Sequence, residues 1–178
     1  NMVMPGAQMD GASIYELLDT EKVTITAAVP TVWLILLNYL QENNLKLPYL
    51  NKVIIGGSAI PEKILRAFEE EFEVDVVHAW GMTETSPLGT LGTLPPHLID
   101  ADVDTRMAQK LKQGRPPFGV ELRVVDDAGT VLARDGKTSG RLLVRGAAIA
   151  AGYFKGDGGD VLDDEGFFDT GDVANIDE

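Results

Sequence analysis

Apolar and polar residues follow different patterns in the two halves of the chain. In the first half, short β-branched runs alternate with longer stretches whose apolar residues recur every three to four positions, which is typical of strands alternating with helices. Residues 23–29, 52–55 and 74–80 predict the strands. The first of these is nearly uncharged, as a strand buried on both faces would be, and Pro30 ends it.

Helices are predicted between these strands. One runs from Thr31, as its capping residue, to about Glu42, and its apolar side chains cover most of its circumference, so we expect it to be largely buried. The next follows Pro61 and buries one face, consisting of Ile64, Leu65, Phe68 and Phe72. A shorter helix is predicted to start at Ser13, which forms a capping-box pattern with Glu16. The alternation predicts a parallel sheet with right-handed crossovers, and ligands of such sheets bind at the carboxyl ends of the strands.

The second half of the chain has a different pattern of apolar and polar residues. Residues 86–97 predict a loop, and residues 102–112 predict a helix that Gly114 stops. Alternating segments at residues 119–126 and 140–144, with a short strand at 131–133 between turns, predict hairpins of an antiparallel sheet. Phe167, Phe168 and Val173 are apolar enough to pack on it. We therefore predict the α/β class, with a parallel βαβαβ sheet portion in residues 1–100 and a helix plus a small antiparallel β-barrel-like subdomain in residues 101–178.

Composition narrows the function classes. The chain has 178 residues, of which 44% are hydrophobic, enough for the core of one domain or of a part of a larger one. A formal net charge of -13 argues against binding to nucleic acid or anionic membrane. The absence of cysteine excludes disulfides, thiolate zinc sites and thiol catalysis. The longest apolar run, residues 32–37, is far below the roughly 18 residues of a transmembrane helix, so we expect a cytoplasmic protein without a transmembrane segment.

Three catalytic or binding patterns are present only in part. The sequence GGSAI at residues 56–60 has Ile60 where the nucleophile elbow of a hydrolase needs glycine. The tripeptide GKT at residues 136–138 ends like a P-loop, but Val131 stands at the position of the first glycine. An EF-hand aligned on Gly166 has Val161 at its first ligand position. We therefore set aside an esterase, a P-loop and an EF-hand.

Four clusters of glycine, aromatic and polar residues carry more chemistry. Residues 56–58 (GGS) follow a strand, where glycines let a ligand approach the backbone. Residues 80–85 (WGMTET) combine an aromatic face, a turn, a hydroxyl and a carboxylate, which suit a purine, a phosphate and a magnesium ion. Residues 146–153 (GAAIAAGY) favour close packing of a bulged strand, and residues 168–172 (FDTGD) place a carboxylate just past a strand, where it could accept both ribose hydroxyls. Taken alone, no cluster favours a ligand site over an ordinary turn or core packing, and for residues 80–85 and 146–153 the ordinary interpretation is the favoured one.

Taken together, the order and spacing of these clusters resemble the adenylate-forming superfamily of acyl-CoA synthetases, luciferases and peptide-synthetase adenylation domains. VTITAAVPTVW resembles the acyl-pocket segment, GGSAIP the loop beneath adenine, and WGMTET the adenine and magnesium motif. GRLLVRGAAIAAGYFKG and FFDTGD resemble two later motifs. VPTVW and MTETSPLGT are most similar to ligases of fatty and related small carboxylic acids. The resemblance implies an acetyl-CoA synthetase-like fold.

The resemblance also implies a role for individual residues. Thr83 would contact the α-phosphate and Glu84 would hold Mg²⁺, which makes them the implied catalytic residues, and Asp172 would bind the ribose hydroxyls. Gly56, Gly57 and Ser58 would border the adenine and the acyl carboxylate. Trp80 would stack on or beside the base, and Gly81 and Met82 would be further nucleotide-binding residues. Val29, Pro30 and Trp33 would shape the acyl pocket, although core packing is equally compatible with Trp33. For His78 a buried structural role is the favoured interpretation.

The implied function is that of an AMP-forming acyl-CoA synthetase, which uses ATP, Mg²⁺ and coenzyme A on a carboxylic acid. The family's lysine-containing phosphate loop and its C-terminal domain do not occur in the sequence, so we expect a piece of a longer enzyme, inactive by itself, whose missing parts lie before and after it. Two alternatives stay open. One is a noncatalytic acidic module that binds a protein partner or calcium through residues 157–172, and the other is an adenylate-forming enzyme with an acceptor other than coenzyme A.

Overall fold

The computed structural model describes all residues from 1 to 178, and they form two compact units. The first unit consists of Asn1–Trp80 and Thr90–Arg115, and the second of Gly81–Gly89 and Pro116–Glu178. This division differs from the boundary expected at residue 100. The helix after residue 100 belongs to the first unit because its side chains are anchored there, and a loop before residue 100 belongs to the second.

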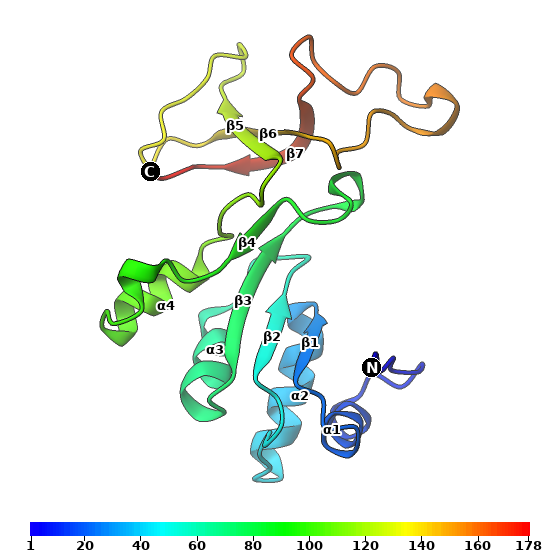
Figure 1. Cartoon of the computed structure of the whole chain (residues 1–178), viewed down its shortest axis with the longest axis vertical. Coiled ribbons are helices and arrows are strands. Elements are labelled where there is room, and N and C mark those ends of the chain that lie inside the picture. The colour runs from blue at the N-terminus through cyan, green and yellow to red at the C-terminus, as the bar shows by residue number, and fades with distance from the viewer. The chain divides into compact units, whose positions relative to one another are not determined.

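The first unit is built on a four-stranded sheet in the order β1-β2-β3-β4, with its helices on one face (Figure 1). Strands β1 (Ile25–Ala28), β2 (Lys52–Ile55) and β3 (Asp75–Trp80) are parallel neighbours, which confirms the predicted strand–helix alternation. Strand β4 (Thr90–Gly92) is antiparallel to β3 and replaces part of the loop expected there. Its short, glycine-containing sequence has no apolar alternation that could have revealed it.

Four α-helices belong to this unit: α1 (Gly11–Thr20), α2 (Pro30–Glu42), α3 (Glu62–Arg66) and α4 (Val103–Leu111). A π-helical turn, Ala67–Glu71, continues α3, so that the predicted face of Ile64, Leu65, Phe68 and Phe72 is buried throughout. Helix α1 begins earlier than predicted, because Asp10 caps it. The Asp10 carboxylate accepts hydrogen bonds from the backbone N–H (3.0 Å) and the hydroxyl (2.8 Å) of Ser13, which therefore lies inside the first turn.

Three further expectations about the first half are wrong. Helix α2 begins at Pro30 without a side-chain cap, since proline at the first helical position is already held in a helical φ, and Thr31 does not cap it. The helix is also only half buried, with Leu34 42% and Ile35 46% exposed. Strand β1 is not buried on both faces, and Ile25 is 57% exposed, because β1 is an edge strand and the helices cover one face only. None of the helices is long and apolar enough to cross a membrane.

Helix α4 is attached to the sheet by an ion cluster around a buried lysine. The ammonium group of Lys110, which is 6% exposed, donates to carboxylate oxygens of Glu69 and of Asp75, at 2.6 Å for Asp75. Glu69 also accepts the backbone N–H of Val76 at 2.7 Å, and Lys52 lies 3.1 Å from Asp75. Burial raises the pKa of Asp75, but the hydrogen bonds and charges of the two lysines outweigh it, so that the net pKa is lowered.

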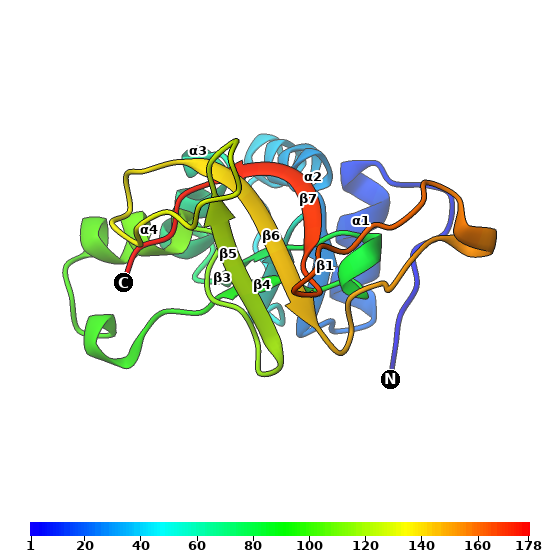
Figure 2. The ribbon, with the colours of Figure 1, turned by 90° about the horizontal axis from the view of Figure 1, so that it is seen from above.

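The second unit is built on an antiparallel sheet in the order β5-β6-β7 (Figure 2). Its strands are β5 (Val120–Val125), β6 (Gly140–Gly146) and β7 (Phe168–Ala174), which confirms the predicted hairpin architecture. The short strand expected at residues 131–133 is reduced to a single bridge between Val125 and Val131. Phe167 and Phe168 are buried as predicted, whereas Val173 is 73% exposed, so the expectation that it packs is wrong.

Candidate functional site

The GGS turn at residues 56–58 lies against the end of β3. Strand β2 pairs in parallel with β3 up to Ile55 opposite His78. A Cβ atom added to Gly56 would stand 2.9 Å from the carbonyl oxygen of Ala79, so only glycine lets the two backbones approach this closely. The turn is therefore in contact with the residue that precedes Trp80, as the parallel topology predicts.

Val29 adjoins the same turn from the neighbouring strand. Gly57 has a φ of +83°, and a Cβ added to it would stand 3.1 Å from Cγ1 of Val29, which is 44% exposed. Pro30 follows as the first, buried residue of α2. The structure thus brings two of the expected acyl-pocket residues, Val29 and Pro30, to the end of the sheet that carries residues 56–58.

Trp33 is placed differently. Its side chain is 1% exposed, its indole N–H donates to the carbonyl of Ala28 at 3.1 Å, and its ring meets that of Phe68 edge to face at 5.7 Å. These contacts are those of a core residue, whose polar atom is satisfied by the backbone. Of the two interpretations that the sequence left open for Trp33, the structure favours core packing.

His78 is buried beneath the end of β3. It is 1% exposed, and its Nδ1 lies 3.1 Å from the carbonyl oxygen of Leu111, at the end of α4. Burial lowers the pKa of His78, and a neutral ring that donates from Nδ1 suits this carbonyl. The hydroxyl of Thr90 donates to the carbonyl of Gln113 at 2.5 Å. The chain following α4 therefore holds β3 and β4 in place just before Trp80, which agrees with the structural role expected for His78.

The residues that follow Trp80 form a tight turn in the second unit. A Cβ atom on Gly81 would overlap the carbonyl oxygen of Pro87 and stand 2.9 Å from its carbon, so this position accepts only glycine. The buried hydroxyl of Thr85 accepts the N–H of Met82 at 2.9 Å and donates to the carbonyl of Pro87 at 2.6 Å. The side chain of Thr83 is exposed. The turn is thus fixed from inside while the Thr83 hydroxyl faces outward.

Glu84 is held by a segment far along the chain. The hydroxyl of Tyr153 donates to Oε1 of Glu84 at 2.6 Å, and the N–H of Ala150 donates to the Glu84 carbonyl at 2.8 Å. The Tyr153 hydrogen bond lowers the pKa of Glu84, and the same contact raises the pKa of Tyr153. The bulged strand predicted for residues 146–153 does not form beyond Gly146. Strand β6 ends at Gly146, because the small residues beyond it turn toward Glu84.

The sequence predicts Asp172 just past a strand, whereas the structure places it within strand β7. Three residues of β7 oppose a single residue of β6 between the Arg141 and Leu143 pairs, which makes a bulge. Gly171 has a φ of +74°, and its N–H donates to Asp169 at 3.0 Å. The N–H of Asp172 donates to the hydroxyl of Thr170 at 3.1 Å. The bulge leaves the side chain of Asp172 exposed.

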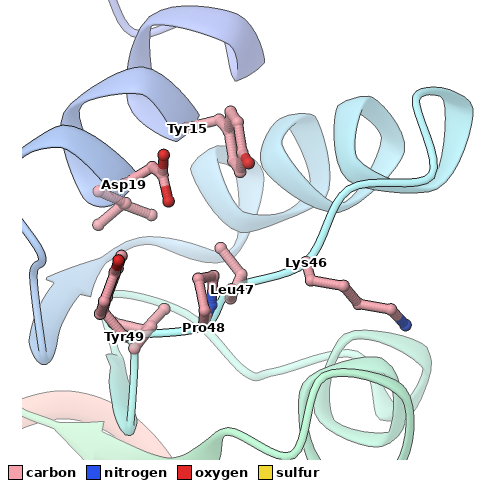
Figure 3. A pocket seen from close by; sticks show the side chains of 8 residues that line it. Tyr15, Asp19, Lys46, Leu47, Pro48 and Tyr49 are labelled. Atoms are coloured by element: carbon pink, nitrogen blue, oxygen red, sulfur yellow. The ribbon is translucent and has the colours of Figure 1, made fainter.

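Two other features are poorer candidates. The pocket of Figure 3 lies between α1 and residues 46–50, which lead into the start of β2, so it is at the opposite end of the sheet from Gly56. Its volume of about 10 Å³ suits one water molecule and not a nucleotide. The chain also has no group of three or more acidic or histidine side chains that could hold a metal ion, so the calcium alternative at residues 157–172 lacks a ligand cluster. A single carboxylate such as Glu84 is sufficient for Mg²⁺, which keeps waters and binds substrate phosphates.

Comparison with known proteins decides the family. Residues 1–154 match the family model described as AMP-binding enzyme. The chain belongs to this family. It is 45% identical over 176 residues to the medium-chain-fatty-acid–CoA ligase of Ectopseudomonas oleovorans, an alignment that covers 99% of this chain and 32% of the relative. It is 43% identical to the 3-methylmercaptopropionyl-CoA ligase of Ruegeria pomeroyi, over 99% of this chain and 32% of the relative. The chain therefore spans about a third of the length of these relatives.

Solved structures of family members agree with the fold. A long-chain-fatty-acid-CoA ligase from Archaeoglobus fulgidus, 28% identical, aligns with a TM-score of 0.75 over 94% of this chain and 35% of its own. An anthranilate CoA ligase in complex with anthranoyl-AMP, 23% identical, aligns with a TM-score of 0.80 over 98% of this chain and 32% of its own. The α/β fold with a separate antiparallel sheet is therefore the arrangement found in these neighbours.

Proposed function

We propose that this chain is the adenylate-binding part of an AMP-forming acyl-CoA ligase that acts on a fatty or related carboxylic acid. The observation that carries the proposal is that relatives named as acyl-CoA ligases align with 99% of the chain at 43–45% identity. The glycine turn at the ends of β2 and β3 supports it, since this end of a parallel sheet is where nucleotides bind.

Individual roles are proposed on the geometry of each unit. In the first unit, Trp80 ends β3 beside the GGS turn and is proposed to lie against the adenine ring. Val29 lies on the same turn and is proposed to contact the acyl group. In the second unit, the exposed hydroxyl of Thr83 is proposed to donate to the α-phosphate, and the exposed carboxylate of Asp172 to accept the ribose hydroxyls.

The proposed chemistry consists of two displacements. The substrate carboxylate attacks the α-phosphorus of ATP, a P–O bond breaks, and acyl-adenylate and pyrophosphate form. The thiol of coenzyme A then attacks the acyl carbon and displaces AMP. Both the nucleotide and this chain, with its formal charge of -13, are negative, so the reaction needs positive charge at the phosphates. Mg²⁺ bound at Glu84 would supply part of it, and Glu84 fits because its Oε2 accepts no hydrogen bond within the chain.

The test uses the longer protein that carries this chain, purified and supplied with ATP, Mg²⁺ and short, medium or long fatty acids. We expect acid-dependent exchange of labelled pyrophosphate into ATP, and acyl-CoA and AMP in equal amounts once coenzyme A is added. The 178-residue chain alone, as the matched control, is expected to release no pyrophosphate. Exchange without thioester formation would favour another acceptor, and the absence of exchange with every acid would contradict the proposal.

A further inference from the structure

The contact between Tyr153 and Glu84 stands apart from the other hydrogen bonds of the WGMTET turn. The bonds made by Thr85 lie within the turn and fix its backbone. The Tyr153 bond instead reaches a side chain 69 residues away in sequence, within the same compact unit, and joins two residues that topology alone brings together.

The segment that carries Tyr153 holds Glu84 at two points. The N–H of Ala150 binds the main-chain carbonyl of Glu84 at 2.8 Å, and the Tyr153 hydroxyl binds the carboxylate at 2.6 Å. Main chain and side chain of the same residue are therefore both fixed.

The geometry leaves one carboxylate oxygen available. Tyr153 occupies Oε1, whereas Oε2 has no hydrogen-bond partner within the chain. A phenol that donates to a carboxylate stabilises its ionised form, and it limits the rotation of the side chain. An ionised carboxylate with one oxygen fixed and one free is suited to bind a cation through the free oxygen.

We propose that Tyr153 is a positioning residue that orients the Glu84 carboxylate toward the divalent cation carried by ATP. This inference rests on the proposed function, in which Glu84 contacts that cation. It assigns a purpose to an exposed tyrosine that ordinary packing does not explain, since the Tyr153 side chain is 46% exposed. Tyr153 itself would not touch the metal or the nucleotide, and its effect would pass through Glu84.

The experiment measures binding in addition to activity, in the longer protein that carries this chain. The affinity for the non-hydrolysable α,β-methylene analogue of ATP is measured by calorimetry with Mn²⁺ and again with EDTA. The affinity with Mn²⁺ divided by the affinity with EDTA is a ratio that gives the contribution of the metal. Tyr153→Phe removes only the hydroxyl. We expect it to lower this ratio about 3- to 10-fold, with the affinity in EDTA unchanged, because the loss of one charge-assisted hydrogen bond loosens the carboxylate.

Two further variants separate the possible outcomes. Glu84→Gln is expected to reduce the ratio further than Tyr153→Phe does. Tyr49→Phe is the matched control, because Tyr49 is a comparably exposed tyrosine, 39% exposed, in the other unit, and it is expected to bind as the wild type does.

In activity assays, Tyr153→Phe is expected to raise the Mg²⁺ concentration at half-maximal rate by a similar factor and to leave the KM for the carboxylic acid unchanged. A wild-type ratio in Tyr153→Phe together with a reduced ratio in Glu84→Gln would overturn the role of Tyr153 and leave the proposed function intact. Tighter metal-dependent binding in Tyr153→Phe would likewise overturn it, since the tyrosine would then compete with the cation. A wild-type ratio in Glu84→Gln would overturn the assignment of Glu84 itself.

Discussion

Replacing Gly81 by alanine tests whether the turn after Trp80 must keep its present shape. The added methyl group would overlap the carbonyl oxygen of Pro87, and it would stand 2.9 Å from the carbon of that carbonyl and 3.1 Å from the nitrogen of Gly89. All three atoms belong to the backbone, so a side-chain rotation cannot relieve the overlap. The turn has to open by a distance of order 1 Å, as overpacked sites do.

The size of the effect follows from the contacts that are lost. Opening the turn breaks the 2.6 Å hydrogen bond from Thr85 to Pro87, at about 1 kcal/mol, in addition to the roughly 1–3 kcal/mol of overpacking. The sum is smaller than the total stability of a typical protein, about 5–15 kcal/mol, so the variant is expected to fold. Thr83 and Glu84 lie on this turn, and a displacement of about 1 Å in a catalytic group lowers rates about 100-fold.

The assay is acid-dependent pyrophosphate exchange by the longer protein, together with its thermal unfolding. Gly81→Ala is expected to lose about 100-fold in exchange and to stay folded at the assay temperature. Gly6→Ala serves as the control, because no heavy atom lies within 4 Å of the position its Cβ would take. Exchange by Gly81→Ala at the wild-type rate would refute the reasoning that the turn positions reactive groups.

Three other substitutions test contacts that stabilise the fold. Lys110→Met leaves Glu69, whose side chain is 16% exposed, without its ammonium partner, whereas Asp75 keeps Lys52 at 3.1 Å, so the variant is expected to lower the free energy of unfolding in urea by about 1–3 kcal/mol. The pKa of Asp75 is lower in the folded than in the unfolded protein, so the ionised Asp75 stabilises the fold at a pH above its pKa in the unfolded chain. This stabilisation is lost as the pH falls through the pKa of Asp75 in the folded protein. Lys110→Met raises that folded pKa, so the variant is expected to lose stability at a higher pH than the wild type. Trp33→Phe is expected to cost about 1–2 kcal/mol and to leave the preference among acids unchanged, whereas a changed preference at unchanged stability would make Trp33 a pocket residue. Phe167→Ala removes a ring stacked by Arg123 (3.9 Å) and Arg145 (4.5 Å) and is expected to destabilise the second unit by about 3–4 kcal/mol in the same urea titration.

Elements that bury a periodic apolar face were predictable from the sequence. Strand β2 begins and ends as expected, and α4 differs by one residue at each end. Helix starts were less predictable, because several polar residues near α1 could cap it and only the backbone decides between Asp10 and Ser13. Strand β4 pairs through backbone groups alone and leaves no pattern of side chains to recognise.

The part of the candidate site that lies at the carboxyl ends of β2 and β3 was predictable from the sequence. Gly56 and Trp80 follow neighbouring parallel strands, so the topology was sufficient to place the turn against the end of β3. The partnership of Tyr153 with Glu84 depends on how the loop after β6 turns, and no local pattern encodes a contact between residues so far apart. The burial of Lys110 was likewise not predictable, because a lysine in a helix is usually exposed and its partners Glu69 and Asp75 lie far away in the sequence.

The most direct test of the central claim is a single-turnover measurement with labelled fatty acid and ATP, without coenzyme A, in the longer protein that carries this chain. The wild type is expected to form one acyl-adenylate and one pyrophosphate per active site. Glu84→Gln is expected to form them about 100-fold more slowly, because the variant holds the metal ion less well and the negative charge on the phosphates in the transition state is then less stabilised. Equal rates of acyl-adenylate formation in the two proteins would contradict the account.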